Sequence, residues 1–146
     1  MVKKAETADA GEIAGLAVLM WDTSTVQELT REFLDAMEQG KAQFFLKYDQ
    51  GIPVGFAQCT LRYDYVEGTE TSPVGYLEGI FVREAYRRKG YARELLSECE
   101  KWAKEKDCRE FASDCEAVND SSFRFHRAVG FEEANRIICF TKNLCI

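Results

Sequence analysis

Proline and histidine are scarce in this sequence of 146 residues, which contains two prolines and one histidine. So little proline excludes a collagen-like repeat and a proline-rich extended linker. The six cysteines include no Cys-x-x-Cys pair, and with one histidine they leave no zinc-ligand spacing. We therefore expect no metal, and reduced thiols of the kind found in cytoplasmic proteins.

Long apolar runs are also missing. No segment approaches the roughly 20 apolar residues of a membrane span. Residues 1–6 are not followed by the apolar region of a secretory signal. We expect a soluble, unexported, cytoplasmic protein with no membrane partner.

The composition that remains is that of one folded domain. Hydrophobic residues make up 46% and charged residues 30%, which is typical of globular proteins and excludes a disordered chain. A chain of this length buries a single core, so we expect one domain spanning residues 1–146. The net charge of −6 comes from residues 1–75, which hold six basic and twelve acidic side chains. This excess disfavours nucleic acid and favours a cationic partner, although solvated helix faces give the same count.

Hydrophobic periodicity predicts alternating strands and helices. Two helices are expected first, one after Thr7 or Asp9 and one capped by Ser24 or Thr25. Two aromatic and β-branched runs around Gly51 then read as a hairpin. The expected strands are 2–6, 42–48, 52–65, 74–82, 109–114 and 131–143, and the later helices are 91–106 and 119–129. This order predicts an α/β fold with a mixed sheet and helices on both faces.

A basic, glycine-containing motif lies between strand 74–82 and the helix after it: Arg87-Arg88-Lys89-Gly90-Tyr91-Ala92. Gly90 permits close backbone approach, successive N–H groups can form a nest, and a helix N-terminus adds positive potential. We interpret this motif as a pyrophosphate cradle, although a basic turn at an exposed helix start has the same residues. It is neither a Walker loop nor a Rossmann fingerprint.

The blocks around this motif resemble the GNAT superfamily of acyl-CoA-dependent N-acetyltransferases in order and spacing. They are Leu77-Glu78-Gly79-Ile80-Phe81-Val82, Asn119-x-x-Ser122 and His126-Arg127-Ala128-Val129-Gly130-Phe131. The resemblance implies the GNAT acyl-CoA N-acyltransferase fold, a mostly antiparallel central sheet flanked by helices, with acetyl-CoA as cosubstrate. The cofactor-binding residues that it implies are Ile80, Phe81, Val82, Arg87, Arg88, Lys89, Gly90, Tyr91, Ala92, Asn119 and Ser122.

A narrower resemblance covers most of residues 62–142. These blocks look like the aminoglycoside 6'-N-acetyltransferases of the GNAT type: Arg62-Tyr63-Asp64-Tyr65-Val66-Glu67-Gly68, Ser72-Pro73-Val74, Cys108-Arg109-Glu110-Phe111-Ala112-Ser113-Asp114 and the block beginning at His126. Residues 1–61 match only in pattern, including a tryptophan at position 21. The resemblance implies a polycationic aminosugar as acceptor and a homodimer.

Two carboxylates are candidate catalytic residues. By strict alternation, Glu78 shares a face of its strand with Tyr76, Ile80 and Val82. A carboxylate in mid-strand is costly unless it is paired or wet. Asp114 ends the next strand, and ligands of α/β sheets gather at strand carboxyl ends. By resemblance, Asp114 contacts or deprotonates the acceptor amine, while satisfaction by backbone N–H groups is the alternative for both carboxylates.

His126 and Cys115 raise two further possibilities. His126 stands where many GNAT enzymes carry a tyrosine that protonates the leaving CoA thiolate. Histidine can supply a proton near neutral pH, but it can equally be a packing residue. A thiolate at Cys115 would allow a ping-pong mechanism. Its acidic neighbours Asp114 and Glu116 disfavour that thiolate.

The acceptor side is expected to combine flat surfaces with negative charge, because ammonium groups pair with carboxylates and cations stack on aromatic rings. Trp21 is equally likely to belong to the core. The candidate acceptor-binding residues are Trp21, Asp22, Tyr65, Glu67, Glu78, Asp114 and Glu116.

The sequence thus predicts an acetyltransferase that moves acetyl from acetyl-CoA to a primary amine by direct attack, through a tetrahedral intermediate. The 6'-amine of an aminoglycoside is the expected acceptor, which would give antibiotic resistance. Two alternatives stay open. One is acetylation of another amine, such as a polyamine, a peptide N-terminus or a lysine, and the other is a GNAT module that binds acyl-CoA without turnover.

Overall fold

The computed structural model describes residues 1–145. The chain forms two compact units, Met1–Asp114 and Cys115–Ile146, and each is described here by itself. Within the described residues no helix is both long and apolar enough to span a bilayer. That residues 1–146 form one domain stays a prediction.

The first unit is built on a five-stranded sheet in the order β1-β2-β3-β4-β5. Strands β1 to β4 are antiparallel to their neighbours, and β5 is parallel to β4. This arrangement confirms the predicted mixed, mostly antiparallel sheet. The strands are β1 (Val2–Lys4), β2 (Ala42–Asp49), β3 (Ile52–Arg62), β4 (Val74–Val82) and β5 (Phe111–Ser113).

The predicted hairpin is the β2–β3 connection. Asp49 pairs with Ile52, so the loop consists of Gln50 and Gly51 alone. Their φ angles of 50° and 78° are both positive, as a two-residue turn of type I′ requires. Glycine adopts this conformation without strain, which explains its presence in the loop.

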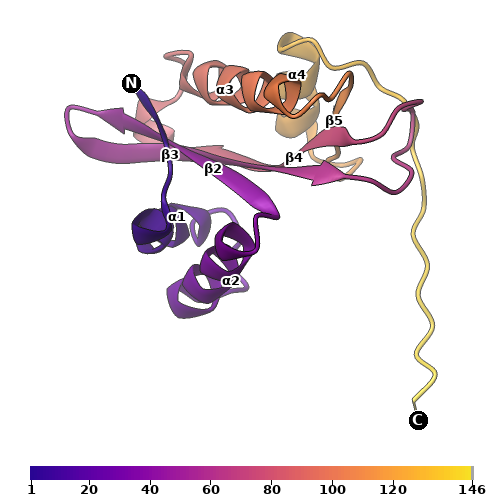
Figure 1. The fold of residues 1–146 in the computed structure, drawn as a ribbon, viewed down its shortest axis with the longest axis horizontal. Helices are drawn as coiled ribbons and strands as arrows, with labels where there is room; N and C mark the ends of the chain where they lie inside the picture. The colour runs from indigo at the N-terminus through magenta and orange to yellow at the C-terminus, as the bar shows by residue number, and fades with distance from the viewer. Residues whose placement is uncertain (146) are drawn as a thin grey trace. The chain divides into compact units, whose positions relative to one another are not determined.

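Two helices cover one face of this sheet and a third covers the other (Figure 1). Helices α1 (Ala10–Ala17) and α2 (Val26–Glu38) lie on the first face, and α3 (Tyr91–Glu105) lies on the second. Thr25 caps α2, because its side chain accepts a hydrogen bond of 3.1 Å from the backbone N–H of Glu28. The predicted helices on both faces are therefore confirmed.

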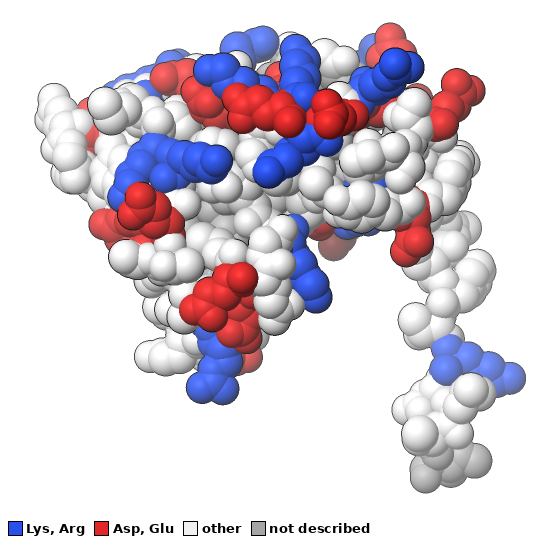
Figure 2. Space-filling model, viewed as in Figure 1, with Lys and Arg blue, Asp and Glu red and all other residues white. Residues whose placement is uncertain are grey.

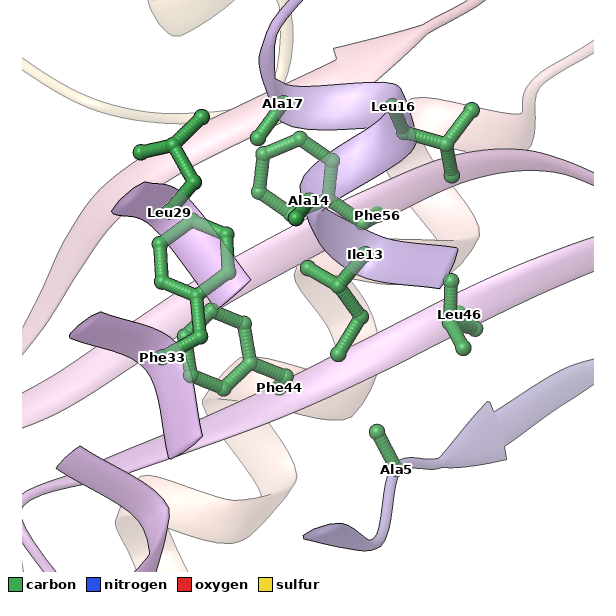
Figure 3. Close-up of a cluster of buried hydrophobic side chains, with 10 residues drawn as sticks. All are labelled: Ala5, Ile13, Ala14, Leu16, Ala17, Leu29, Phe33, Phe44, Leu46 and Phe56. Carbon is green, nitrogen blue, oxygen red and sulfur yellow. The ribbon is translucent and has the colours of Figure 1, made fainter. Parts of the chain in front are cut away.

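The apolar faces of α1 and α2 close over β2 and β3 to form a core cluster. The rings of Phe33 and Phe44 lie with centroids 4.8 Å apart in its centre. Figure 3 shows the ten buried members converging from two helices and the sheet: Ala5, Ile13, Ala14, Leu16, Ala17, Leu29, Phe33, Phe44, Leu46 and Phe56.

Helix α3 buries its own apolar stripe against β2, β3 and β4. Its packing is close, since a Cβ atom added at Gly75 of β4 would lie 2.7 Å from the Cβ of Ala103. The solvent side of α3 carries both basic and acidic side chains (Figure 2). The buried stripe is Leu95, Leu96, Cys99, Trp102 and Ala103.

Strand β4 contains a β-bulge at Glu78. Gln58 of β3 pairs with Gly79, while the next residue, Cys59, pairs with Leu77. Strand β4 therefore has one residue more than β3 at this point. A bulge bends the strand and re-aims its side chains and backbone groups.

The bulge overturns one expectation about β4. Residues directly opposite one another in an antiparallel pair share a face, and Ile80 and Val82 lie opposite Ala57 and Gly55. A Cβ atom at Gly55 would point at Leu95 of α3, so these residues face α3. The prediction that Glu78 shares a face with Ile80 and Val82 is wrong, because strict alternation fails where a residue is inserted.

The second unit contains one helix, α4 (Asp120–Ala128), followed by an extended segment. Asn119 caps α4, accepting a hydrogen bond of 3.1 Å from the N–H of Ser122. The expected strand at residues 131–143 is wrong, because no strand is formed after residue 128 in the described chain. A β-strand needs a neighbour to take up its backbone hydrogen bonds, and within the described residues this segment pairs with none.

Candidate active site

An unpaired stretch of the β4 edge is the first feature of the site. Strand β5 pairs with β4 only at Gly75, Tyr76 and Leu77. Beyond Leu77, the edge of β4 that faces β5 has no strand partner within the described residues. Free N–H and C=O groups on such an edge can bind an extended molecule as an added strand. The predicted cofactor-binding residues Ile80, Phe81 and Val82 lie on this stretch.

A loop with left-handed backbone follows the β4 edge directly. Arg88 and Gly90 have φ angles of 66° and 82°, and Gly90 is the N-cap of α3 without any side-chain cap. Successive N–H groups in such a loop form an anion-binding nest, which the helix dipole strengthens. A Cβ atom added at Gly90 would have nothing within 4 Å. This open loop has room for a pyrophosphate group, and the cradle stays a prediction.

Three side chains of the motif hold the loop. The Nε atom of Arg87 donates a hydrogen bond of 2.7 Å to the carbonyl oxygen of Val82. The Tyr91 hydroxyl donates to Asp49 Oδ2 at 2.5 Å, and Lys89 Nζ lies 3.9 Å from the same oxygen. These contacts tie the start of α3 to the end of β4 and to the β2–β3 hairpin. Asp49 was not predicted, because its partner Tyr91 lies 42 residues away in the sequence and no local pattern relates the two.

The Glu78 carboxylate is fully engaged by the protein itself. Arg62 Nη2 lies 3.0 Å from both of its oxygens, and Thr60 Oγ1 donates to Oε2 at 2.7 Å. The Arg62 guanidinium also lies over the ring of Tyr76, 3.5 Å from its centroid. Glu78 therefore meets the requirement that a mid-strand carboxylate be paired, and its charge is balanced by Arg62.

The Asp114 carboxylate has a different partner, the hydroxyl of Tyr76, which donates to Oδ2. Burial and this hydrogen bond raise the pKa of Tyr76 far above its ordinary value. The phenol therefore stays protonated throughout the neutral range and is the donor toward Asp114. Asp114 itself is exposed. Asp114 and Glu78 are thus joined through one continuous contact path that runs across Tyr76 and Arg62.

Trp21 lies at the bulge on the face covered by α1 and α2. Its ring meets Phe33 and Phe56 edge-on, with centroids 6.3 and 6.0 Å away. A Cβ atom at Gly79 would lie 2.7 Å from the indole, so glycine is required there. Trp21 remains partly exposed. It therefore packs in the core and also contributes to the surface beside Glu78.

The other predicted acceptor residues lie in exposed positions. Asp22 and Glu67 are exposed. Tyr65 is 76% exposed, and its hydroxyl accepts a long hydrogen bond from the N–H of Gly68 in its own loop. Glu116 is exposed in the second unit.

His126 lies on α4 with a defined ring orientation. Its Nδ1 atom is 2.7 Å from the carbonyl oxygen of Ser122, an acceptor, so Nδ1 carries the proton in this arrangement. Proton donation to another molecule then requires Nε2 of a protonated imidazole. The ring of Phe131 is 5.1 Å away. Asn119 and Ser122, which were expected to bind CoA, form the N-terminal cap of the same helix.

Comparison of the chain with known proteins identifies its family. A family model described as the acetyltransferase (GNAT) family matches residues 8–131. This chain belongs to the GNAT acetyltransferases. It is 36% identical over 143 residues to an aminoglycoside N(6')-acetyltransferase type 1 of Acinetobacter haemolyticus, covering 98% of each chain. It is 40% identical over 141 residues to the enzyme of that name from Stenotrophomonas maltophilia, covering 95% of this chain and 90% of the other.

Solved structures of GNAT acetyltransferases agree with the fold. The apo structure of the aminoglycoside 6'-N-acetyltransferase AAC(6')-IG from Acinetobacter haemolyticus has a TM-score of 0.92 and 35% identity, over 99% of each chain. The structure of AAC(6')-Iy in complex with the bisubstrate analogue CoA-S-monomethyl-acetylneamine has a TM-score of 0.93 and 31% identity, over 98% of this chain and 97% of the other. The GNAT fold and the recognition of this family in the sequence are thereby confirmed.

No group of metal-ligating side chains is present among the described residues.

Proposed function

We propose that this chain transfers the acetyl group of acetyl-CoA to the 6'-amine of an aminoglycoside and thereby gives resistance to such antibiotics. The observation that carries this proposal is the near full-length similarity to AAC(6')-Iy in complex with an analogue that joins CoA to an acetylated neamine. The strand edge, the cradle at Gly90 and the two linked carboxylates support it.

The cofactor half of the site is assigned to β4 and the loop after it. The backbone of residues 80–82 binds pantetheine along the free edge, and the nest from Arg87 to Ala92 binds the pyrophosphate. Backbone N–H groups freed by the bulge at Glu78 polarise the thioester carbonyl. Asn119 and Ser122 contribute at the start of α4.

The acceptor half is assigned to the carboxylates and the aromatic residues. An ammonium group must lose a proton before its nitrogen can attack, and Asp114 takes that proton directly or through one water. The nitrogen lone pair then attacks the thioester carbon to form a tetrahedral intermediate. The intermediate loses the second amine proton to water, and it collapses to the amide as the carbon–sulfur bond breaks and the CoA thiolate leaves. Glu78, paired with Arg62, shapes the acceptor surface, and the surrounding contacts are assigned to Trp21, Asp22, Tyr65, Glu67 and Glu116.

The leaving thiolate needs a proton for release as free CoA. We assign this donation to Nε2 of His126, whose Nδ1 is held by Ser122. A thiolate is a good leaving group, so loss of His126 should lower turnover less than loss of Asp114.

A thiol-release assay with a panel of amines tests this function. A kanamycin-type compound with a 6'-amine should be acetylated efficiently, and the rate below saturation should fall as salt screens the attraction between ammonium and carboxylate groups. A compound with a hydroxyl at that carbon, a polyamine and a lysine peptide should react far more slowly. Preference for the polyamine or the peptide would contradict the proposed acceptor, and binding of acetyl-CoA without turnover of any amine would indicate a non-catalytic module.

We also propose that the chain is a cytoplasmic homodimer. Large apolar side chains project from the segment after α4: Ile137, Ile138, Phe140 and Leu144 are 68%, 80%, 87% and 84% exposed. Such a run of exposed apolar residues marks an interface, and a second copy is the occupant we propose. The six cysteines form no disulfide, which suits a reducing compartment.

Light scattering on the purified protein tests the dimer. The full chain should have twice the monomer mass, and the double variant Ile138→Glu, Phe140→Glu should be monomeric. Val118→Glu is the matched control, because Val118 is 87% exposed in the same unit but lies outside the segment. A monomeric full chain, or a double variant that stays dimeric, would contradict the interface.

A further inference from the structure

Tyr76 occupies an unusual position for a tyrosine of the sheet. It is only 5% exposed, yet its hydroxyl reaches the exposed Asp114, which directly follows β5. Tyr76 pairs with Ala112 of β5 in the parallel ladder, so the ring extends along the neighbouring strand toward that strand's end. The hydroxyl of this buried tyrosine thus contacts Asp114, the carboxylate proposed to act as the base.

The Tyr76 ring is fixed by its surroundings. The Arg62 guanidinium lies over one face of the ring, and the guanidinium is itself held by the Glu78 carboxylate. Glu78 is held in turn by Thr60. A guanidinium that makes both an ion pair and a ring stack has little freedom to move. The hydroxyl of Tyr76 is therefore a donor in a defined place.

We propose that Tyr76 is a positioning residue that holds Oδ2 of Asp114 and so directs Oδ1 toward the amine of the acceptor. A lone exposed aspartate rotates about its side-chain bonds, and each misplaced orientation lowers the fraction of productive encounters. Fixing one oxygen removes that freedom and leaves the second oxygen with its lone pairs available. This inference rests on the proposed function, in which Asp114 accepts the amine proton.

The arrangement also separates the roles of the two carboxylates. Glu78 accepts hydrogen bonds on both oxygens and is balanced by a cation, so it is unsuited to take a proton from the acceptor. Asp114 has one neutral donor and no ion pair among the salt bridges of the described residues. Asp114 is therefore the carboxylate suited to act as the base, and Glu78 anchors Arg62.

A double-mutant cycle with Tyr76→Phe and Asp114→Asn tests the proposal. Phenylalanine keeps the ring and its contact with Arg62 but removes the hydroxyl. Tyr76→Phe should lower kcat by about tenfold while KM for acetyl-CoA stays within about twofold. In the Asp114→Asn background the same change should cost less than about twofold, because the hydroxyl acts through Asp114. An equal loss in both backgrounds, or no loss in either, would overturn the proposal.

Tyr48→Phe is the matched control. The hydroxyl of Tyr48 also donates to a carboxylate, Glu12 Oε2 at 2.8 Å, and its pKa is likewise raised, to about 12. This pair joins β2 to α1 and lies outside the proposed site. Removing its hydroxyl should leave kcat and both KM values unchanged, and a loss equal to that of Tyr76→Phe would indicate a general effect of deleting buried hydroxyls.

A spectroscopic titration tests the contact without relying on turnover. The ultraviolet absorbance of wild type minus that of Tyr76→Phe follows ionisation of Tyr76 alone. Burial raises the pKa of Tyr76 most, and the hydrogen bond to Asp114 and its negative charge raise it further, so Asp114→Asn should let Tyr76 ionise at lower pH. An unchanged titration would contradict the contact. If the wild type turns over no amine, the proposed function is contradicted. The titration still tests the contact between Tyr76 and Asp114 in that case.

Discussion

Gly90→Val is expected to abolish the rise in melting temperature that acetyl-CoA gives to the wild-type protein. A ligand at a hundredfold excess over its Kd stabilises a folded protein by about 2.7 kcal/mol, which is several degrees in Tm. Gly90 has a φ of 82°, where a β-branched residue is strained by roughly 1–3 kcal/mol. Its side chain would also enter the space proposed for the pyrophosphate. The measurement is thermal unfolding with and without acetyl-CoA.

Gly40→Val tests whether backbone strain alone explains the loss of the acetyl-CoA shift in Gly90→Val. Gly40 follows α2 with a φ of 68°, and a Cβ atom there would also have nothing within 4 Å. This control variant should lose similar stability and still show the full shift with acetyl-CoA. A folded Gly90→Val variant that shifts as the wild type does would show that the cradle lies elsewhere.

Asp114→Asn is expected to lower turnover by about 10²-fold or more, the usual contribution of a general base. The amide nearly preserves the shape of the side chain but cannot take the amine proton. The KM for acetyl-CoA should change little, because the strand edge and the loop proposed to bind it are separate from this carboxylate. Steady-state kinetics with each substrate varied in turn provides the measurement.

Asp35→Asn is a suitable control for Asp114→Asn, because Asp35 is exposed on α2 and the change in charge is the same. Its kinetics should match the wild type. If Asp114→Asn turns over at the wild-type rate, Asp114 has no role in the chemistry. If only the KM of the acceptor rises, Asp114 binds the acceptor but is not the base.

Local features of the sequence predicted most of the first unit. The two-residue hairpin, the cap at Thr25 and the apolar stripe of α3 depend on residues within a few positions of one another. The start of α3 directly after Gly90 was also predictable, since a glycine between a basic turn and a helix is a local signal. These elements are formed by short-range interactions that a single sequence displays.

The bulge and the side-chain network were not predictable in this way. The Glu78 bulge exists because β3 and β4 differ by one residue in register, a relation between strands that periodicity within β4 cannot reveal. Tyr76 and Asp114 are 38 residues apart, and Arg62 and Glu78 are 16 apart. Neither pair has a local signal, so the sequence indicated the carboxylates but not their partners.

The prediction of a strand at residues 131–143, after α4, was wrong for another reason. Its β-branched and aromatic residues are typical of a strand, but within the described residues no strand pairs with it. Composition predicts which segments can form strands, whereas a strand also requires a neighbour. In the proposed dimer the second copy would supply that neighbour.

The position of the new acetyl group tests the central claim most directly. The protein is incubated with acetyl-CoA and a kanamycin-type aminoglycoside, and the product is analysed by NMR and mass spectrometry beside a related compound with a hydroxyl at the 6' carbon. We predict one acetyl group, on the 6' nitrogen of the first compound, and no acetylation at that carbon of the second. Acetylation at a different amine, or of both compounds alike, would contradict the account.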